Sequence, residues 1–346
     1  MKILQVIDKL DLGGAERVFV DLTNILYENK YDVCCLFLIE KGYLSKQLNS
    51  NIAYFELNRK NKFSFQKIFE CANILKKYDV IHCHMRHVYR YIKLISKIFA
   101  INNVIIFHEH SGLINSNSKI PFLFNSYFKP KYYIGVSKSH TEWAINKIRI
   151  DKKNVFYLPN TIIWDNCIHE GNKVRQSDFL LIGNIKETKN HIFAVEIAKK
   201  LNKSLNIIGY NQSKLYFEEL EKKIVQLGAD VIIYENIDSV KNQILSSKMG
   251  ISTSFHESGP LVLIEFLCAG LPFLSYKTGE VSEIVHKYYP EFFIDNFNID
   301  DWSNRIKLIL GNNYSPDNLQ EIYTIHFSPS VYYTRLTKIY DQVCGS

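Results

Sequence analysis

Short apolar runs alternate with amphipathic stretches along this 346-residue chain, and no other feature limits its possible folds so strongly. Lys2–Ile7 has the composition of a buried strand, and Glu16–Tyr27 has apolar residues at helical spacing. Strands that alternate with helices are typical of a parallel sheet with helices on both faces. The pattern predicts further strands at Asp32–Leu38, Val80–Cys83, Val104–Phe107 and Tyr132–Val136, and further helices at Phe63–Lys76 and Tyr89–Phe99.

The alternation stops near Tyr157–Thr161, passes through a polar stretch at Asp165–Ser177 and starts again. We therefore predict two doubly wound α/β units in series, with a cleft between them at the carboxyl ends of both sheets. The predicted boundaries are 1–162 and 163–327, followed by an amphipathic closing helix within 328–346. The second unit has predicted strands at Phe179–Ile182, Ser204–Ile208, Val231–Tyr234, Met249–Thr253 and Pro272–Ser275, and helices at His191–Leu201, Leu215–Leu227 and Leu261–Ala269.

The composition fits two hydrophobic cores, since 47% of the residues are hydrophobic and 22% are charged. No apolar run reaches the ~18 residues that a membrane-spanning helix needs, and the first residues do not resemble a signal peptide. The seven cysteines are scattered and form no CxxC pair, which argues against a disulfide framework or a zinc cage. We expect a cytoplasmic protein with reduced thiols.

The positive charge is concentrated in the first half. Residues 1–160 contain 24 Lys and Arg against 13 Asp and Glu, whereas the remainder contains 18 against 22. This asymmetry suggests an anionic surface or substrate. We expect no nucleic-acid partner, because zinc-finger spacing and the aromatic signature of RNA-binding domains are both missing from the sequence.

A membrane surface fits the basic first half better. Arg86, Arg90, Lys93 and Lys97 follow helical spacing and form one basic stripe, a basic run occupies 59–62, and 120–128 is rich in aromatic residues. These features predict peripheral docking on an anionic leaflet. The alternative is an ordinary solvated helix face beside a packed loop.

The segment 256–272 carries the strongest chemical pattern. Glu257 precedes a Gly-Pro helix start, and Glu265 follows eight residues later within that helix. Free backbone amides at a helix start attract an anion such as diphosphate, and carboxylates accept hydrogen bonds from sugar and ribose hydroxyls. The alternative is that both glutamates are solvated helix residues.

This segment resembles the E-x7-E hallmark of glycosyltransferase family 4, and the resemblance extends over most of the chain. The family implies the GT-B fold, in which two Rossmann-like domains face a central cleft. Similar motifs are Gly13-Gly14-Ala15-Glu16-Arg17, Val136-Ser137, Leu158-Pro159-Asn160, the phosphate segment from Gly183 to Lys189, and Phe327-Ser328 with a closing helix that crosses back to the first domain.

The resemblance implies a role for each matched residue. Glu265 would hold the ribose, Glu257 would contact the donor sugar, Lys189 would neutralise the diphosphate, and His110 would lie by the anomeric carbon, with His108 as the weaker choice. We therefore predict His110, Glu257 and Lys189 as catalytic residues. The predicted donor-binding set is Gly13, Gly14, Gly183, Asn184, Lys189, Ser258, Gly259, Pro260, Leu261 and Glu265.

Two positions depart from the family pattern. Asn184 follows Gly183 where the family has arginine, which removes a bidentate phosphate clamp that Lys186 could partly replace. Thr161 follows Asn160 where the family has glycine, a change expected to alter only the local backbone.

The family implies transfer of a hexose or N-acetylhexosamine, with retention, from a nucleoside diphosphate sugar to a glycan or polyprenyl-linked acceptor in bacterial polysaccharide or glycolipid assembly. It implies no cofactor and no metal. His82, His84 and His87 resemble a metal cluster but have no fourth ligand at suitable spacing, so we interpret them as polar residues at a strand end.

Three other functions stay open at this point. One is a GT-B phosphorylase or epimerase, and another is a polyanion-binding module. The third is a catalytically silent nucleotide-sugar-binding partner of a membrane glycan-assembly complex, which Asn184 would explain.

Overall fold

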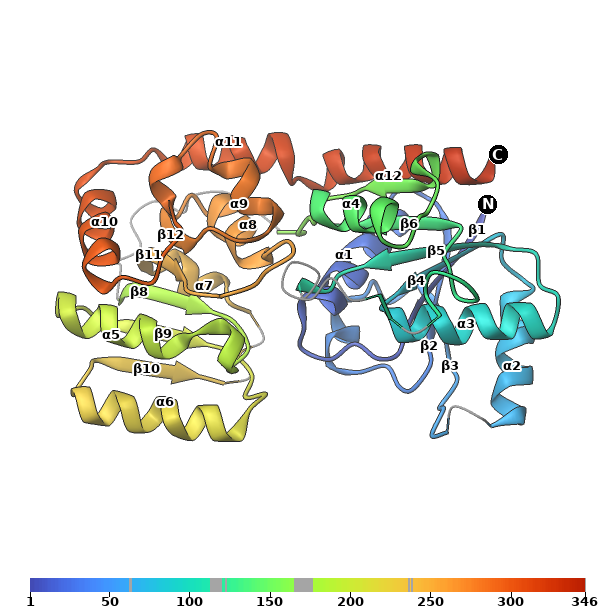
Figure 1. Cartoon of the computed structure of the whole chain (residues 1–346), viewed down its shortest axis with the longest axis horizontal. Helices are drawn as coiled ribbons and strands as arrows, with labels where there is room; N and C mark the ends of the chain where they lie inside the picture. Colours follow the sequence, from blue (N-terminus) through green and yellow to red (C-terminus); the bar gives the residue numbers. More distant parts are fainter. Residues whose placement is uncertain are drawn as a thin grey trace. The chain divides into compact units, whose positions relative to one another are not determined.

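The chain divides into two compact units (Figure 1). The computed structural model describes residues 1–61, 64–112, 120–121, 123–164, 177–235, 237 and 239–345. The first unit comprises Met1–Ile163 and Pro329–Ser346, and the second comprises Trp164–Ser328. The first unit is therefore built from the two ends of the chain.

The first unit contains a parallel sheet in the order β3-β2-β1-β4-β5-β6-β7. Its strands are β1 (Lys2–Ile7), β2 (Asp32–Phe37), β3 (Ala53–Glu56), β4 (Val80–His84), β5 (Val104–Glu109), β6 (Tyr132–Gly135) and β7 (Val155–Tyr157). Its helices are α1 (Gly14–Glu28), α2 (Phe65–Leu75), α3 (Arg86–Ile98), α4 (Lys138–Asn146) and α12 (Pro329–Cys344), with short 3-10 helices η1 (Tyr43–Gln47) and η3 (Lys152–Asn154).

Strand residues that alternate in direction supply a core on each face of this sheet. Leu4 and Val6 of β1 share one core with α2, α3 and α4. Ile3 shares the other with α1 and α12, because successive side chains of a strand point to opposite faces. Helix α12 enters that second core through Tyr332, Leu336, Ile339, Tyr340 and Val343.

The second unit repeats the design with the strand order β10-β9-β8-β11-β12-β13, also parallel. Its strands are β8 (Ser177–Ile182), β9 (Leu205–Ile208), β10 (Val231–Tyr234), β11 (Ser247–Ser252), β12 (Phe273–Tyr276) and β13 (Phe293–Ile294). Its helices are α5 (His191–Leu201), α6 (Lys214–Leu227), α7 (Lys241–Leu245), α8 (Leu261–Cys268), α9 (Gly279–Val285), α10 (Ile299–Gly311) and α11 (Pro316–His326), with η4 (Glu187–Lys189) and η5 (Pro290–Phe292).

These two sheets confirm the predicted doubly wound α/β fold. The strand order reverses between β1 and β4 in one sheet and between β8 and β11 in the other. Doubly wound sheets bind ligands at the carboxyl ends of the strands beside such a reversal. The loops that follow these four strands are therefore where binding residues are expected.

The structure differs from the prediction mainly at short elements. The sequence analysis did not predict strands β3, β7 and β13 or helices α4, α7, α9, α10 and α11. Two to four residues give a strand little pattern, and α10 and α11 mix apolar with polar residues in similar numbers. Helix α3 begins three residues before the predicted helix. The predicted linker Asp165–Ser177 lies outside the described residues except for Ser177, which instead begins β8. None of the described helices has the length and apolar character to span a bilayer.

We predict that Gly250 of β11 is needed for stability, because a Cβ there would stand 2.3 Å from the Phe266 ring of α8. Gly250→Ala should lower the free energy of unfolding by about 1–3 kcal/mol, the usual effect of overpacking a core. Chemical denaturation measures this change.

Gly311→Ala is the matched control, since nothing lies within 4 Å of a Cβ at that helix end. It should leave stability unchanged or raise it by at most about 1 kcal/mol. Equal losses in both variants would contradict the packing argument.

Candidate functional site

The loop after β8 is anchored on both sides of Asn184. The Gly183 amide donates to the Ile208 carbonyl at 2.8 Å, and the Ile185 amide donates to the Tyr210 carbonyl at 2.8 Å. A Cβ at Gly209 would stand 2.0 Å from the Gly183 oxygen, so only glycine lets the loops after β8 and β9 approach this closely. The predicted phosphate segment therefore has a fixed backbone.

Lys189 ends the same loop and returns over its beginning. Its Cδ lies 3.4 Å from the position that a Cβ of Gly183 would take. The Thr253 hydroxyl, at the end of β11, donates to the carbonyls of Lys189 and Asn190, both at 2.9 Å. Two strands that flank the reversal thus position this lysine together.

The loop between β11 and α8 presents Glu257. The Phe255 amide donates to the Thr188 carbonyl at 3.0 Å, and the Glu257 amide donates to the Thr278 hydroxyl at 3.2 Å. The Ser258 carbonyl accepts from the Glu280 amide at 2.8 Å. The loop is consequently tied to its neighbours on both sides.

Gly279 permits the close contact between this loop and the turn from β12 into α9. It has φ +80°, and a Cβ there would stand 2.9 Å from Pro260 Cδ and 3.1 Å from Glu257 Cβ. Sequence reasoning missed Thr278, Gly279 and Glu280. A glycine between a strand and a helix was the available signal, because such turns favour residues that accept a positive φ.

Lys189 and Glu257 form an ion pair, which joins two of the three predicted catalytic residues. The Lys189 side chain is 22% exposed and the Glu257 side chain is 14% exposed, so the pair is screened from bulk water yet open to a ligand. Lys189 is held by the β8 loop and Glu257 by the β11 loop. The pair therefore places a cation and a carboxylate side by side at the predicted anion site.

The start of α8 completes this group. Gly259 and Pro260 are buried, while Ser258, Leu261 and Glu265 are partly exposed. A helix start offers unpaired amides and the positive end of the helix dipole to an anion. Glu265 lies on the same helix, one turn beyond Leu261.

In the first unit, Gly13 and Gly14 form the turn from β1 into α1. Gly13 is the N-cap and Gly14 is exposed, so the backbone is accessible there. Arg17, one turn on, holds the buried Asp21 through two bonds of 3.0 and 3.2 Å and donates to the Ile163 carbonyl at 3.1 Å. Arg17 thus braces this helix and does not point away into solvent.

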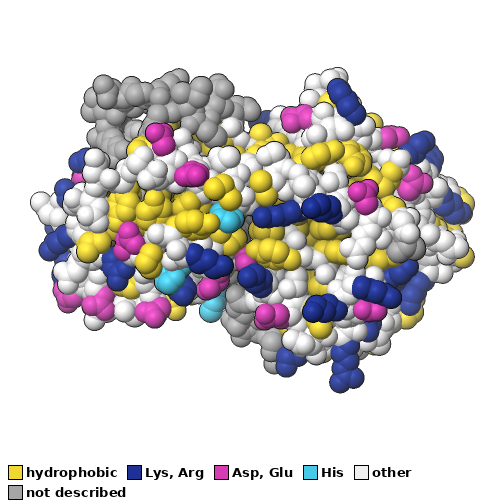
Figure 2. Space-filling model, turned by 90° about the horizontal axis from the view of Figure 1, so that it is seen from above, with side chains coloured by type: hydrophobic (Ala, Val, Ile, Leu, Met, Phe, Trp, Pro, Cys, Tyr) yellow, Lys and Arg dark blue, Asp and Glu magenta, His cyan; other side chains and the backbone are white. Residues whose placement is uncertain are grey.

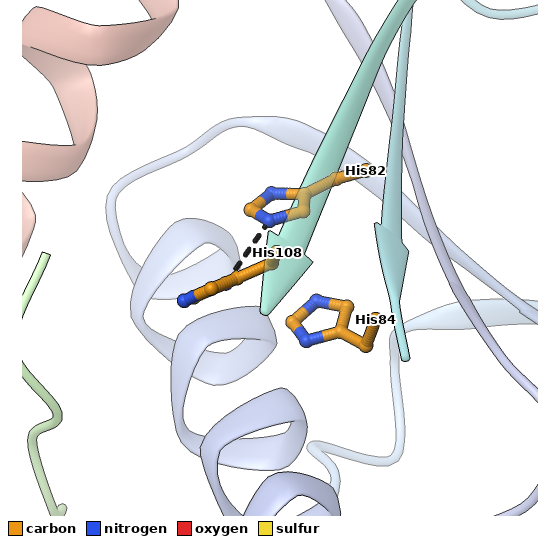
Figure 3. Close-up of side chains that lie close together, drawn as sticks. All are labelled: His82, His84 and His108. Atoms are coloured by element: carbon orange, nitrogen blue, oxygen red, sulfur yellow. Dashed lines mark hydrogen bonds between the residues drawn. The ribbon is translucent and has the colours of Figure 1, made fainter. Parts of the chain in front are cut away.

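Histidines gather at the carboxyl ends of β4 and β5 (Figure 3). His82, His84 and His108 are buried, and the partly exposed His110 stacks on His84 at a centroid distance of 5.2 Å. Parallel pairing places His84 directly opposite His108. His87, considered with His82 and His84 in the sequence, instead bonds to Asp8 at 2.7 Å.

Among the described residues, His82, His84 and His108 have ring nitrogens within 4.8 Å of one another, close enough to consider a metal. Their nitrogens already bond to neighbours: His82 to Tyr340 at 2.8 Å and to His108 at 3.2 Å, and His84 to Gln5 and to His110, both at 3.0 Å. We interpret the group as a hydrogen-bonded network. The absence of a metal requirement stays a prediction.

Burial holds these rings neutral. It lowers the pKa of His82 and of His110 to about 3, with neighbouring histidines adding to the effect on His110. The pKa values of His84 and His108 are lowered in the same way, by burial first and by the adjacent rings second. Neutral rings can each donate one hydrogen bond and accept one.

Three side chains of the basic stripe on α3 contact neighbouring parts of the first unit. Arg86 pairs with the buried Glu109, whose pKa is nevertheless raised by burial. Arg90 lies over the Phe128 ring and Lys97 over the Tyr127 ring. On the face that Figure 2 shows, basic side chains lie among hydrophobic and acidic ones.

We predict that the buried histidines make the fold acid-sensitive. Their folded pKa values lie below that of an exposed histidine, so below about pH 6.5 the unfolded chain binds more protons. The free energy of unfolding should be level above that pH and fall below it, by about 1.4 kcal/mol per pH unit for each ring that stays neutral.

Chemical unfolding at pH 7.5, 6.5 and 5.5 measures this slope. A His256→Gln variant, which removes an exposed histidine, should follow the same curve. A level free energy down to pH 5.5 would contradict the assignment of neutral rings.

Comparison with known proteins agrees with this geometry. The model of Glycosyltransferase Family 4 matches residues 12–163, and the model of Glycosyl transferases group 1 matches residues 167–323. The GalNAc-alpha-(1->4)-GalNAc-alpha-(1->3)-diNAcBac-PP-undecaprenol alpha-1,4-N-acetyl-D-galactosaminyltransferase of Campylobacter jejuni is 25% identical over 77% of each chain. The capsular polysaccharide biosynthesis glycosyltransferase CapH of Staphylococcus aureus is 24% identical over 60% of this chain and 59% of its own.

Solved structures share the fold over the whole chain. Anabaena Alr3699/HepE, crystallised with UDP and glucose, has a TM-score of 0.79, with 16% identity and 98% of each chain covered. The lipopolysaccharide outer core galactosyltransferase WaaB has a TM-score of 0.72, with 18% identity, and covers 98% of this chain and 99% of its own. The two sheets are thus the two Rossmann-like domains of the GT-B fold, and this chain belongs to glycosyltransferase family 4.

Proposed function

We propose that the chain is a retaining glycosyltransferase that moves a hexose or N-acetylhexosamine from a nucleoside diphosphate sugar to a glycan or lipid-linked glycan. The Lys189–Glu257 pair at the start of α8 carries this proposal. It supplies a cation for the diphosphate and a carboxylate for sugar hydroxyls at one place. These are the two kinds of group that a nucleotide sugar requires.

Lys189 and the amides at the start of α8 bind the diphosphate. As the bond from the anomeric carbon to the diphosphate oxygen breaks, negative charge grows on that oxygen. A fixed cation and fixed amide dipoles stabilise this charge without reorganising. Asn184 provides no guanidinium at this site, so Lys189 carries more of the task than it would beside an arginine.

The carboxylates of Glu257 and Glu265 orient the donor. Glu257 accepts hydrogen bonds from the sugar, and Glu265 accepts them from the ribose hydroxyls. The proposed role of Gly13 and Gly14 is to let the donor phosphates or the acceptor approach their backbone, and the proposed role of His110 is to act on the anomeric carbon. Since UDP, UDP-glucose and glucose were found with HepE, uridine nucleotides are the first donors to test.

The new bond forms on the face that the leaving group vacates. The acceptor oxygen bonds to the anomeric carbon, and the acceptor proton passes to the leaving diphosphate oxygen, so atoms and charge balance. No protein nucleophile and no metal takes part in this scheme. Turnover should therefore persist in the presence of a chelator.

The acceptor is proposed from the relatives. The Campylobacter jejuni enzyme extends a glycan on PP-undecaprenol, and CapH serves capsular polysaccharide biosynthesis. We infer that this chain also extends a bacterial polysaccharide or glycolipid, with a polyprenyl-linked glycan as acceptor.

The first test is nucleoside diphosphate release from a panel of UDP-, GDP- and ADP-sugars with chelator and a bacterial lipid extract. Lys189→Met should lower kcat/KM by about 100- to 1000-fold, the effect of removing one fixed donor from a developing anion. Glu257→Gln should lower it by about 10- to 100-fold, the value of a hydrogen bond to a charged group.

Lys186→Met is the matched control, because it removes a second lysine from the same loop. It should change kcat/KM by less than about 10-fold. If Lys186→Met were the more damaging change, the assignment of Lys189 would be wrong. Binding of a donor without turnover would instead favour the catalytically silent partner.

Peripheral membrane binding is a further part of the proposal. Phe65 and Phe69 of α2 are 88% and 59% exposed, and Ile98 at the end of α3 is 58% exposed. Lys97 precedes Ile98 in α3, and its Nζ lies 3.6 Å from the centre of the Tyr127 ring. Apolar side chains beside lysines are typical of surfaces that enter an anionic leaflet.

We predict that a Phe65→Ser/Phe69→Ser variant binds vesicles containing phosphatidylglycerol at least about 10-fold more weakly than the parent protein, because two rings no longer enter the interface. Sedimentation with vesicles measures this. Leu215→Ser/Val225→Ser removes two side chains of 80% and 81% exposure from α6 of the other unit and should have no effect. Equal losses in the two variants would contradict a specific docking surface.

A further inference from the structure

Six side chains of the first unit form one hydrogen-bonded chain. It runs from His110 to His84, Gln5, Tyr340, His82 and His108 in that order. The five bonds measure 3.0, 3.0, 3.1, 2.8 and 3.2 Å. The members come from β1, β4, β5, the residue after β5 and α12, so both ends of the polypeptide contribute.

The amide of Gln5 gives this chain a direction. Its oxygen can only accept, so the Nε2 of His84 carries the proton that joins them. A neutral His84 then has its lone pair on Nδ1, which accepts from the Nε2–H of His110. The proton of neutral His110 is therefore on Nε2.

The Gln5 amide also fixes the donors and acceptors in the other half of the hydrogen-bonded chain. The Gln5 NH2 donates to the Tyr340 oxygen, so the Tyr340 hydroxyl is left to donate to Nδ1 of His82. His82 then donates from Nε2 to Nδ1 of His108. The chain ends at Nε2 of His108, a buried nitrogen with no partner among the described residues.

Burial makes these assignments depend on one another. Gln5, His82, His84, His108 and Tyr340 are all at most 1% exposed, so water does not compete for their bonds. Each neutral ring has one donor and one acceptor, and reversing one link requires reversing the next. The tautomer of His110 is thus coupled to groups several bonds away.

We propose that Tyr340 and Gln5 are positioning residues that hold His110 as the Nε2–H tautomer, with its lone pair on Nδ1. This inference rests on the proposed function for the claim that His110 acts beside the donor sugar. It gives the closing helix α12 a task beyond packing. A side chain from the last turns of the polypeptide sets the protonation of a residue at the carboxyl end of the first unit's sheet.

The test compares two tyrosines of α12. Tyr340→Phe removes the hydroxyl that links Gln5 to His82, whereas Tyr332→Phe removes a hydroxyl that is equally buried and has no partner among the described residues. Both variants keep the aromatic ring in the same core. Circular dichroism should show that both are folded.

The first measurement is the ring ¹⁵N spectrum of histidine-labelled protein, with the signals assigned through single His→Gln variants. In the parent protein and in Tyr332→Phe, His110 should have a pyrrole-like Nε2 and a pyridine-like Nδ1. In Tyr340→Phe, and in Gln5→Met, which breaks the chain from β1, the two nitrogens should become mixed. An unchanged His110 spectrum in both chain-breaking variants would overturn the proposal.

The second measurement is turnover with the donor found for the parent protein. Tyr340→Phe should lower kcat by about 3- to 10-fold, the value of one neutral hydrogen bond. It should leave the dissociation constant of the nucleoside diphosphate unchanged, because none of the residues predicted to bind that ligand belongs to the hydrogen-bonded chain. Equal losses of kcat in Tyr332→Phe would overturn the assignment.

The two measurements separate the two claims. A parent protein without turnover would contradict the proposed function, while the ¹⁵N spectrum would still decide whether the chain sets the tautomer. Titration with Zn²⁺ provides a further check. If stoichiometric Zn²⁺ shifted the ring signals of His82, His84 and His108 together, the cluster would be a metal site and the hydrogen-bonded assignment would be overturned.

Discussion

Parallel strand pairing is the constraint on which both units depend. It brings the carboxyl ends of neighbouring strands to one edge, and polar groups that follow those strands must then find partners near that edge. His84 and His108 are in register across β4 and β5, and the loops after β8 and β11 meet through Thr253 and Lys189. Strand order and register therefore determine which sequence positions lie close enough to act together, whatever side chains they carry.

Much of this arrangement could be predicted from the sequence. The apolar run of β1 and the restart at β8 define two sheets, because buried parallel strands are continuously apolar. The frame around Glu257 and the family resemblance of the segment from Gly183 to Lys189 predicted two residues that the fold brings together as an ion pair. Local sequence pattern was sufficient to predict a residue's position wherever its neighbours come from its own strand and the helix that follows.

The remaining features depend on contacts between distant segments. Gln5 and Tyr340 are separated by 335 positions, and nothing near either residue indicates that they bond. Gly279 supports the Glu257 loop only because Pro260 and Glu257 lie against it in space. The basic stripe of α3 is a further example, because nothing in its spacing indicates that Glu109 from the next strand pairs with Arg86.

The Lys189–Glu257 pair also suggests how recognition of the two ends of a donor is coupled. Two partly buried charges are tolerated because each compensates the other, and removing either leaves the partner at a desolvation cost. A diphosphate arriving alone would draw Lys189 away and leave Glu257 without its cation. A diphosphate that carries a sugar supplies hydroxyls to Glu257 in the same step. Under the proposed function, the pair would therefore be better satisfied by the intact nucleotide sugar than by either half, which would favour the substrate over its products at this site.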